Sequence, residues 1–241
     1  MKIIDTNTFE KLKIRSVNVN NLKNIYNYFP STTEELRKLI IDRINKKGYD
    51  VDLNDIDVSK IKNMQRLFYI YDDDRFTKFC GKISRWDVSN VVNMDQMFYG
   101  CCKFNDDLSG WNVSSVTTMS GMFYDCSKFN CNLNDWDVSH VVDFSSMFSG
   151  CHRFNSPLNK WNIKSAKTID HMFEVCEEFN QDISDWDISN VEDLRGTFYN
   201  AKNFYCDLSG WDLENKIYKN LFFGTMMTGY PNYLPKNYKN L

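Results

Sequence analysis

The residue types that most often carry chemistry are few in this chain, and they do not converge. The three histidines, His140, His152 and His171, fall at three different positions of a repeated pattern, so no Ser-His-Asp or Cys-His pairing can be argued from them. No glycine-rich phosphate loop is present. The acidic run at 72–74 could hold a metal ion, but such runs more often form solvated loops. We therefore predict that the protein is not an enzyme and uses no cofactor and no metal.

Four of the eight cysteines recur at a spacing of 25 residues. They are Cys101, Cys126, Cys151 and Cys176, and Ala201 takes the next place in the series. A position that accepts alanine favours a small buried residue, so we expect reduced, packed thiols of the kind found in a reducing compartment. A ladder of disulfides is the alternative, because neighbouring strands lie about 4.8 Å apart and a disulfide tolerates that separation. No Cys-x-x-Cys pair is present, which disfavours zinc.

An aspartate or asparagine follows the central apolar residue of each repeat, at a position we call W+1 because that residue is usually tryptophan. The W+1 residues are Asp57, Asp87, Asn112, Asp137, Asn162, Asp187 and Asp212. We expect them to form a structural ladder in which the side chains bond the backbone or hydroxyls of adjacent coils. Calcium binding is the alternative, since stacked carboxylates supply hard oxygen ligands, but the two asparagines interrupt the charge.

Two further positions carry polar residues and are candidates for binding a partner. The W−1 residues are Arg85, Gly110, Asp135, Lys160, Asp185 and Gly210. The W+4 residues are Asn90, Ser115, His140, Ser165, Asn190 and Asn215. Varied residues at one structural position suit a surface that recognises a partner, whereas uniform positions carry structure. The alternative is a solvated surface on which residues drift freely.

The spacing of the tryptophans indicates what positions these side chains. Trp86, Trp111, Trp136, Trp161, Trp186 and Trp211 are the only tryptophans, and each follows the last by 25 residues. A fixed period of this length predicts a solenoid, in which each repeat must pack on its neighbours to bury its apolar face. Seven coils would start at Leu53, Ile83, Leu108, Leu133, Leu158, Ile183 and Leu208. We expect the indole rings to point inward and form a continuous interior row.

Within each coil the apolar period changes from two to about 3.6. Trp111 and Val113 flank a polar residue, which predicts a short strand, and residues 119, 122, 123 and 126 have the spacing of two helical turns. A residue suited to an N-cap precedes the expected helix in six coils, at Asn63, Asn93, Thr118, Asp143, Thr168 and Asp193. The predicted fold is therefore an α/β, leucine-rich-repeat-like solenoid of about seven stacked strand-helix coils.

A capping helix is expected before the first coil. Thr32 and Glu35 form a capping-box pattern, apolar residues follow on one helical face, and Gly48 ends the segment. A repeat array needs such an end piece, with one apolar and one solvated face. The predicted regions are residues 1–52 as an N-terminal extension and capping helix, 53–223 as the solenoid, and 224–241 as a C-terminal cap.

The charge balance restricts the possible partners. The formal net charge is −3 and the isoelectric point is near 5.7, which disfavours nucleic acid or an anionic membrane as partner. No run of 18 apolar residues predicts insertion into a membrane, and no secretory signal is visible after Met1. We therefore expect a cytoplasmic protein, with the cell surface or secretion as the alternative. The sequence does not define the oligomeric state.

The repeat motif resembles a known family. The segments ISRWDVSNVVNMDQMFYGCCKFND and ISDWDISNVEDLRGTFYNAKNFYCD are similar to the repeats of BspA-type leucine-rich repeat proteins, and the resemblance covers residues 31–223. It implies a repeat fold of the kind found in surface or secreted proteins implicated in adhesion and protein binding. The function we expect is a non-catalytic scaffold that binds a protein partner through the strand face. The alternative is a displayed adhesin or virulence factor that binds a host protein or matrix.

Overall fold

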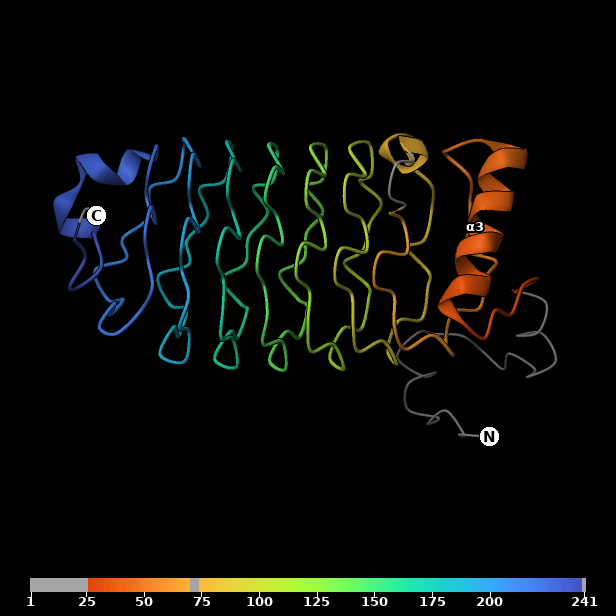
Figure 1. Ribbon diagram of the computed structural model, residues 1–241, viewed down its shortest axis with the longest axis horizontal. Helices are drawn as coiled ribbons and strands as arrows, with labels where there is room; N and C mark the ends of the chain where they lie inside the picture. The colour runs from red at the N-terminus through yellow and green to blue at the C-terminus, as the bar shows by residue number, and fades with distance from the viewer. Residues whose placement is uncertain (1–25, 70–73, 240–241) are drawn as a thin grey trace, which may run out of the picture.

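The protein is an elongated array of windings that lie side by side along one axis. The computed structural model describes residues 26–69 and 74–239. Figure 1 shows the helix α3 at one end of the array and the last described residues at the other. The part of the acidic run at 72–74 that precedes Asp74 therefore lies outside the described residues.

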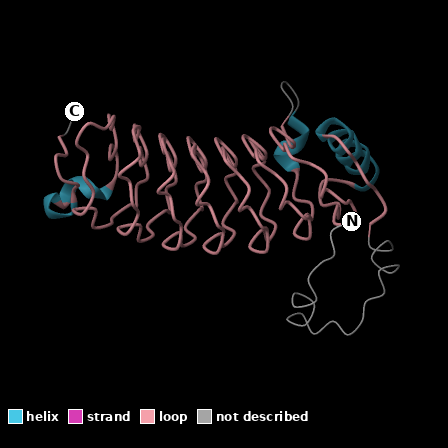
Figure 2. Cartoon of the chain, turned by 90° about the horizontal axis from the view of Figure 1, so that it is seen from below, coloured by secondary structure: helices cyan, strands magenta, loops and turns pink. Residues whose placement is uncertain are grey.

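Regular secondary structure is sparse in the described part of the chain. It comprises the α-helix α3 (Thr33–Lys47) and the short 3₁₀ helices η1 (Asp74–Lys78), η2 (Met226–Gly229) and η3 (Pro231–Tyr233). No strand is formed in these residues; single parallel bridges, such as Thr118 with Asp143, join the windings instead. Figure 2 accordingly shows the windings as loops and turns. The predicted α/β leucine-rich-repeat-like solenoid of stacked strand-helix coils is therefore wrong.

Residues with positive φ interrupt the windings and prevent an α-helix from forming there. In the winding that starts at Asn93, Gln96 has φ 54° and Gly100 has φ 72°, so the chain leaves helical geometry twice in eight residues. Asn93 does accept a hydrogen bond from the amide of Asp95, at 2.9 Å, as an N-cap would. Each predicted N-cap position instead carries a bridge to the next winding, so the residues Asn63, Asn93, Thr118, Asp143, Thr168 and Asp193 mark bridges and not helix starts.

In the segment 94–100, every second backbone amide donates a hydrogen bond to a carbonyl of the following winding. The donors Met94, Gln96, Phe98 and Gly100 bond the carbonyls of Thr118, Ser120, Met122 and Tyr124 at 2.7–3.1 Å. The amides between them close tight turns, as in the bond from Met97 to the carbonyl of Met94 at 3.2 Å. Backbone groups that a helix would satisfy internally are thus satisfied between windings.

The core is a row of aromatic rings that continues from winding to winding. Phe98, Phe123 and Phe148 are fully buried, and their ring centroids are 5.4 and 5.7 Å apart. All six tryptophans are at most 4% exposed. Five of the six indole N–H groups donate to a backbone carbonyl of the preceding winding, as Trp136 does to Leu108 at 3.0 Å. The period therefore identifies the buried residues even though it misidentifies the backbone that carries them.

Helix α3 covers the first winding. Thr32 caps it by accepting from the amide of Glu35, and Leu36, Ile40 and Ile44 are buried. The carbonyls of the first winding have no preceding winding to accept from, and α3 supplies donors to them. The bonds run from Thr33 to the carbonyl of Asn63 and from Arg37 to the carbonyls of Gln65, Arg66 and Leu67.

The C-terminal segment covers part of the last winding. Lys236 forms a parallel bridge with Asp212, and the ring of Tyr238 lies 5.3 Å from that of Phe222.

In the last winding, Lys216 occupies the position that a small apolar residue occupies in earlier windings. Its ammonium group donates to three carbonyls of the preceding winding, those of Ile188, Ser189 and Val191, at 2.7–3.2 Å. Burial lowers the pKa of Lys216.

Candidate partner-binding surface

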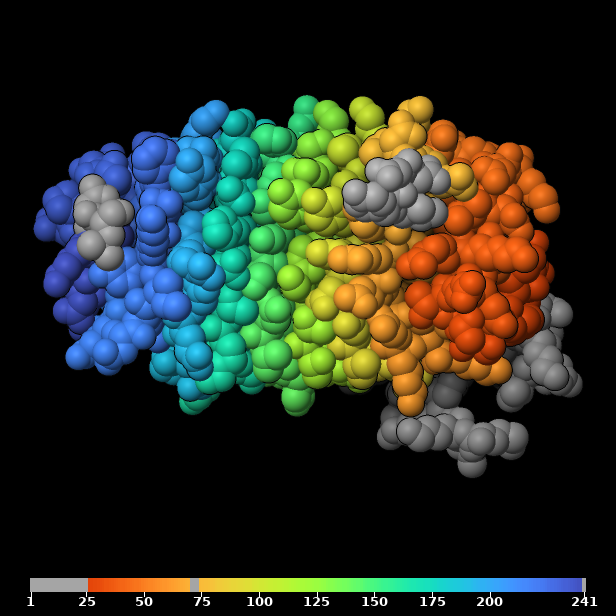
Figure 3. Space-filling model, viewed as in Figure 1, coloured from red at the N-terminus to blue at the C-terminus, as the bar shows by residue number. Residues whose placement is uncertain are grey.

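The W−1 residues form an exposed line along the array. Arg85, Gly110, Asp135, Lys160, Asp185 and Gly210 are all exposed. Lys160 and Asp135 form an ion pair at 2.7 Å, with side chains that are 63% and 71% exposed. An ion pair so exposed contributes little to stability, so the column is available for contacts with another molecule. In Figure 3 each winding contributes one band to a continuous surface.

The W+4 residues are also exposed, but most of their side chains bond the preceding winding. The bonds are Asn90 to the carbonyl of Ser59 (2.9 Å), Ser115 to Ser89 (2.8 Å), Ser165 to Ser139 (2.6 Å) and Asn190 to Lys164 (2.9 Å). His140 differs, since its Nδ1 lies 3.4 Å from the hydroxyl of the adjacent Ser139. The ladder between windings that the sequence predicts at W+1 is therefore found at W+4.

The W+1 residues bond inside their own winding. Asp137 accepts from the amide of Ser139 at 3.1 Å and from its hydroxyl at 2.6 Å, and each of the other W+1 residues accepts from the amide two residues later. Such Asx turns fix the chain direction locally. Hydrogen bonds from Ser139 lower the pKa of Asp137, and those from Ser189 lower the pKa of Asp187. These carboxylates therefore remain charged at neutral pH.

Charge along this side of the array is mainly acidic. We call the seven carboxylates of the W−1 and W+1 columns the acidic stripe, which consists of Asp57, Asp87, Asp135, Asp137, Asp185, Asp187 and Asp212. Lys160 and Arg85 are the basic residues in the same two columns. The stripe does not define a metal site, because in the described residues no three His, Cys, Asp or Glu side chains are grouped so that they could hold an ion.

The cysteines that recur every 25 residues are fully buried free thiols. Cys101, Cys126, Cys151 and Cys176 each donate to the carbonyl of a phenylalanine in the preceding winding, as Cys126 does to Phe98 at 3.0 Å. Burial raises the pKa of each thiol well above its usual range. A thiol that stays protonated is a poor nucleophile, so this column serves packing and not chemistry.

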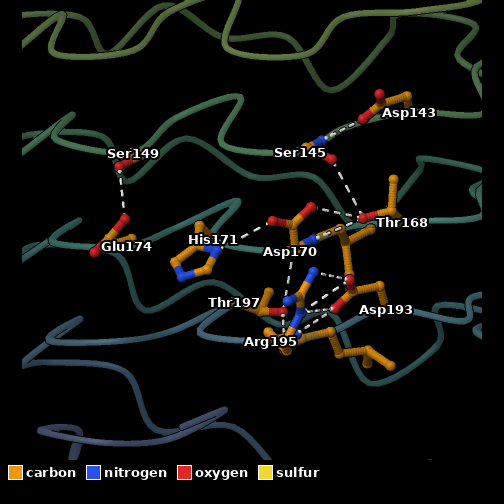
Figure 4. Close-up of polar contacts among 12 residues, drawn as sticks. Asp143, Ser145, Ser149, Thr168, Asp170, His171, Glu174, Asp193, Arg195 and Thr197 are labelled. Carbon is orange, nitrogen blue, oxygen red and sulfur yellow. Dashed lines mark hydrogen bonds and ion pairs between the residues drawn. The ribbon is translucent and has the colours of Figure 1, made fainter. Parts of the chain in front are cut away.

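A second polar cluster contains the one histidine that contacts a neighbouring carboxylate closely. Figure 4 shows a chain of contacts from Ser145 through Thr168 and Asp170 to His171. The Ser145 and Thr168 hydroxyls are 3.2 Å apart, Thr168 donates to Asp170 at 2.7 Å, and Asp170 lies 3.1 Å from Nδ1 of His171. Burial alone would raise the pKa of Asp170, but hydrogen bonds from the hydroxyls and the imidazole lower it overall.

The order of contacts in this cluster differs from that of a nucleophilic triad. In a triad the histidine lies between the hydroxyl and the carboxylate. Here the carboxylate of Asp170 lies between the hydroxyl of Thr168 and His171, so the imidazole does not contact the hydroxyl that it would have to activate. The neighbouring Arg195 is held by Asp193 in a two-pronged ion pair at 2.6–3.0 Å. The cluster therefore joins adjacent windings through polar contacts.

A depression that the sequence pattern does not predict lies at the junction of α3 and the first winding. Arg43, which is 7% exposed, pairs there with Asp55 at 3.0 Å and donates to the carbonyl of Asp52 at 2.8 Å. Lys47 and Arg85 also line it. Asp50, Asp52 and Asp55 line it as well, so acidic and basic side chains are equal in number and the depression does not favour an ion of one sign.

The recurring windings and columns define a repeat protein. The chain belongs to the family described as "Mycoplasma protein of unknown function, DUF285", which matches residues 3–73, 42–151 and 131–228. The three overlapping matches together extend over most of the chain and are consistent with an internal repeat. No curated protein and no solved structure matches the chain. In the described residues, no helix has the length and apolar character needed to cross a membrane.

Proposed function

We propose that this protein is a non-catalytic scaffold that binds a protein partner through the W−1 column, next to which the W+1 carboxylates of the acidic stripe add negative charge. One contrast supports the proposal. The W+1 and W+4 side chains are mostly used in hydrogen bonds that hold the windings, whereas the W−1 side chains differ in charge and size from winding to winding and are exposed. Variation at an exposed, structurally equivalent position supplies specificity without disturbing the array.

The charge of this surface favours a basic partner. The stripe combines carboxylates whose pKa is lowered, such as Asp137 and Asp187, with the W−1 carboxylates of Asp135 and Asp185. Exposed charges of one sign speed the approach of an oppositely charged protein and make the association depend on ionic strength. We therefore expect binding to weaken as salt is raised from about 0.05 to about 0.5 M.

Substitution in the W−1 column tests the proposal. Proteins captured from the native source by the wild-type chain would be compared with those captured by Asp135→Ala/Lys160→Ala/Asp185→Ala. Lys103→Ala/Lys128→Ala is the matched control, because these two lysines are also exposed but lie at a different repeat position. We expect the W−1 variant to lose a partner that the control retains, with both melting temperatures near that of the wild type. Equal capture by all three chains, or collapse of the W−1 variant on heating, would contradict the proposal.

The repeat motif also supports a second candidate function, in which the protein is displayed at a cell surface. We propose that the Trp-Asp-Val-Ser-Asn-Val segment at 86–91 relates the chain to BspA-type surface repeat proteins, which would make a displayed adhesin the second candidate function. Labelling of Cys80, which is exposed, by a thiol reagent that does not cross membranes distinguishes the two locations in intact cells. Labelling without lysis supports display at the surface, and labelling only after lysis supports the cytoplasmic scaffold.

A further inference from the structure

One repeat position of the array carries a row of basic residues. Each of them precedes a buried phenylalanine, at the position we call F−1, and together we name them the basic row: Lys78, Lys103, Lys128 and Arg153. All four are exposed and belong to successive windings. Glu178 and Asn203 take the F−1 position in the next two windings, so the row ends at Arg153. The basic row and the acidic stripe therefore use different repeat positions of one array.

Buried phenylalanines set the spacing of the basic row. Phe79, Phe104, Phe129 and Phe154 are 0% exposed, and the centroids of successive rings are 5.8, 6.2 and 6.1 Å apart. The planes of successive rings differ by at most 9°, so the rings repeat almost by translation. Because each basic residue is the chain neighbour of one of these phenylalanines, the array presents one basic side chain about every 6 Å along this row.

The charges of the basic row are not neutralised by carboxylates of the described residues. Lys103, Lys128 and Arg153 form no ion pair within residues 26–69 and 74–239. Lys202, by contrast, pairs with Glu177 at 2.6 Å. Like charges at this spacing repel one another, and a partner that supplies negative charge relieves the repulsion.

A column of asparagines lies two residues beyond the cations in sequence. The side-chain oxygens of Asn105, Asn130 and Asn155 each accept from the backbone amide of the equivalent residue in the next winding, at 2.9 Å. The Nδ2 groups of these asparagines donate no hydrogen bond in the part of the chain that the structure describes, and none of the three residues is buried. The column therefore offers N–H donors beside the cations, a combination that suits a partner rich in carboxylate acceptors.

The spacing and the flanking residues distinguish between kinds of anionic partner. Side chains on one side of an extended peptide repeat about every 6.6 Å, close to the spacing of the row. Binding of single-stranded nucleic acid relies on exposed aromatic rings, and binding to a membrane surface relies on apolar side chains beside the cations. The exposed neighbours His152, Asn105 and Asn130 are polar, so an acidic peptide fits this surface best.

We propose that the basic row binds an acidic segment of a partner protein, which lies along the array in an extended conformation. Carboxylates at alternate positions of the segment pair with the successive cations, and the asparagine Nδ2 groups donate to carboxylate or carbonyl oxygens of the same segment. Flexible lysine side chains absorb the small difference between the two spacings. The basic row does not include the W−1 column, so this interaction stands or fails independently of the function proposed above.

Binding of a synthetic peptide to the full chain tests the basic row. The probe is a fluorescent decapeptide that alternates glutamate and serine, followed by anisotropy at about 0.05 M salt. We expect Lys103→Gln/Lys128→Gln/Arg153→Gln to bind it at least about tenfold more weakly than the wild type, with an unchanged melting temperature.

The matched control is Lys164→Gln/Lys167→Gln/Lys219→Gln, which removes the same amount of charge from exposed residues at other repeat positions. It should bind the peptide within about twofold of the wild type, because the basic row is intact. An equal loss in both variants, or no loss in the first, would overturn the proposal.

A second peptide tests the extended conformation. A decapeptide with its glutamates consecutive and its serines consecutive has the same charge, but places fewer carboxylates on one side of a strand. We expect it to bind several-fold more weakly than the alternating peptide. Equal affinity for the two peptides would contradict recognition of the spacing, and tighter binding of single-stranded DNA or anionic vesicles at the same residues would show that the partner class is wrong. Lys103→Ala/Lys128→Ala should lose affinity for the alternating peptide while retaining the partner of the W−1 column, which separates the two proposals.

Discussion

At the residue scale, the tryptophans act through their N–H groups as well as their ring area. Each indole from Trp86 to Trp186 donates to a carbonyl of the preceding winding at 2.9–3.4 Å, which fixes the ring and joins two windings. Trp211 is equally buried, yet its Nε1 has no acceptor among residues 26–69 and 74–239. The two situations allow the contribution of the bond to be measured apart from that of the ring.

Replacement of tryptophan by phenylalanine should cost more at 136 than at 211. Both substitutions remove a similar buried volume, but Trp136→Phe also removes a hydrogen bond, whereas Trp211→Phe removes a buried donor without a partner. The expected difference in the free energy of unfolding is about 1 kcal/mol. Urea unfolding of both variants measures it, with Trp161→Phe as a control that should resemble Trp136→Phe because its bond is 2.9 Å long. A larger loss at 211 would show that its N–H is satisfied in solution.

Which residues are buried could be predicted from the period alone, but the partners of the polar residues could not. A spacing of 25 places residues in equivalent positions and so identifies the tryptophan, phenylalanine and cysteine columns as core. It does not say whether a side chain bonds along its own winding or across to the next. The pattern predicts that Asp137 bonds adjacent coils, but it accepts from Ser139 of its own winding; the pattern also gives no sign that Ser165 donates to the preceding winding.

At the element scale, the sequence misleads because two structures share one apolar pattern. Inward residues at i, i+3, i+4 and i+7 fit a helix, but they also fit a run of tight turns that returns to the same face. One repeat position distinguishes the run of turns from a helix, because its residues all have positive φ. These residues are Gly100, Asp125, Gly150, Val175, Asn200 and Gly224. Glycine, asparagine and aspartate adopt this conformation at the lowest cost, and no helix needs them at a fixed interior position.

Two glycines of this column should respond differently to alanine. Gly100 has φ 72° and open space around the missing Cβ, so Gly100→Ala should cost only the strain of a left-handed alanine, about 1 kcal/mol. Gly150 has φ 74°, and a Cβ there would lie 2.1 Å from Oδ1 of Asp125 and 3.2 Å from its Cα. Gly150→Ala should therefore cost a further 1–3 kcal/mol or so for overpacking.

A double substitution isolates the contact with Asp125. Asp125→Gly removes the clashing oxygen and keeps a residue suited to its own φ of 55°. In this background Gly150→Ala should cost nearly the same as Gly100→Ala does in the wild type, as measured by chemical unfolding of the four chains. If the extra cost at 150 persists without the Asp125 side chain, the strain lies in the backbone and not in the contact.

At the scale of the whole molecule, each winding contacts only its neighbours, so stability accumulates along the array and similar contributions add. The buried thiols are such a set, because Cys101, Cys126, Cys151 and Cys176 occupy one position in four successive windings. Alanine at 201 shows that the array tolerates loss of the sulfur. The same thiol group therefore titrates at four equivalent positions, and replacement by alanine removes it without changing the fold.

Stability should fall steeply at alkaline pH because of these four thiols. Burial raises their pKa in the folded chain well above the unfolded value of about 8.5, so the folded chain retains protons that the unfolded chain releases. The sign follows from linkage: the contribution of each thiol is fully present below about pH 8.5 and is lost as pH rises toward the folded pKa, at about 1.4 kcal/mol per pH unit. Between pH 8.5 and 10 the four together should lower the free energy of unfolding by several kcal/mol.

Urea unfolding at a series of pH values from 7 to about 10, below most tyrosine ionisation, measures this slope. Replacing all four cysteines by alanine should lower stability at pH 7, since buried volume is lost, but should flatten the alkaline dependence. Cys80→Ala is the matched control, because Cys80 is exposed and should leave the slope unchanged. A wild-type chain whose stability does not change between pH 8.5 and 10, and regains the slope on addition of a reductant, would instead indicate that neighbouring windings are joined by disulfides. The slope thus tests directly whether the windings are held by packing between reduced thiols or by covalent bonds.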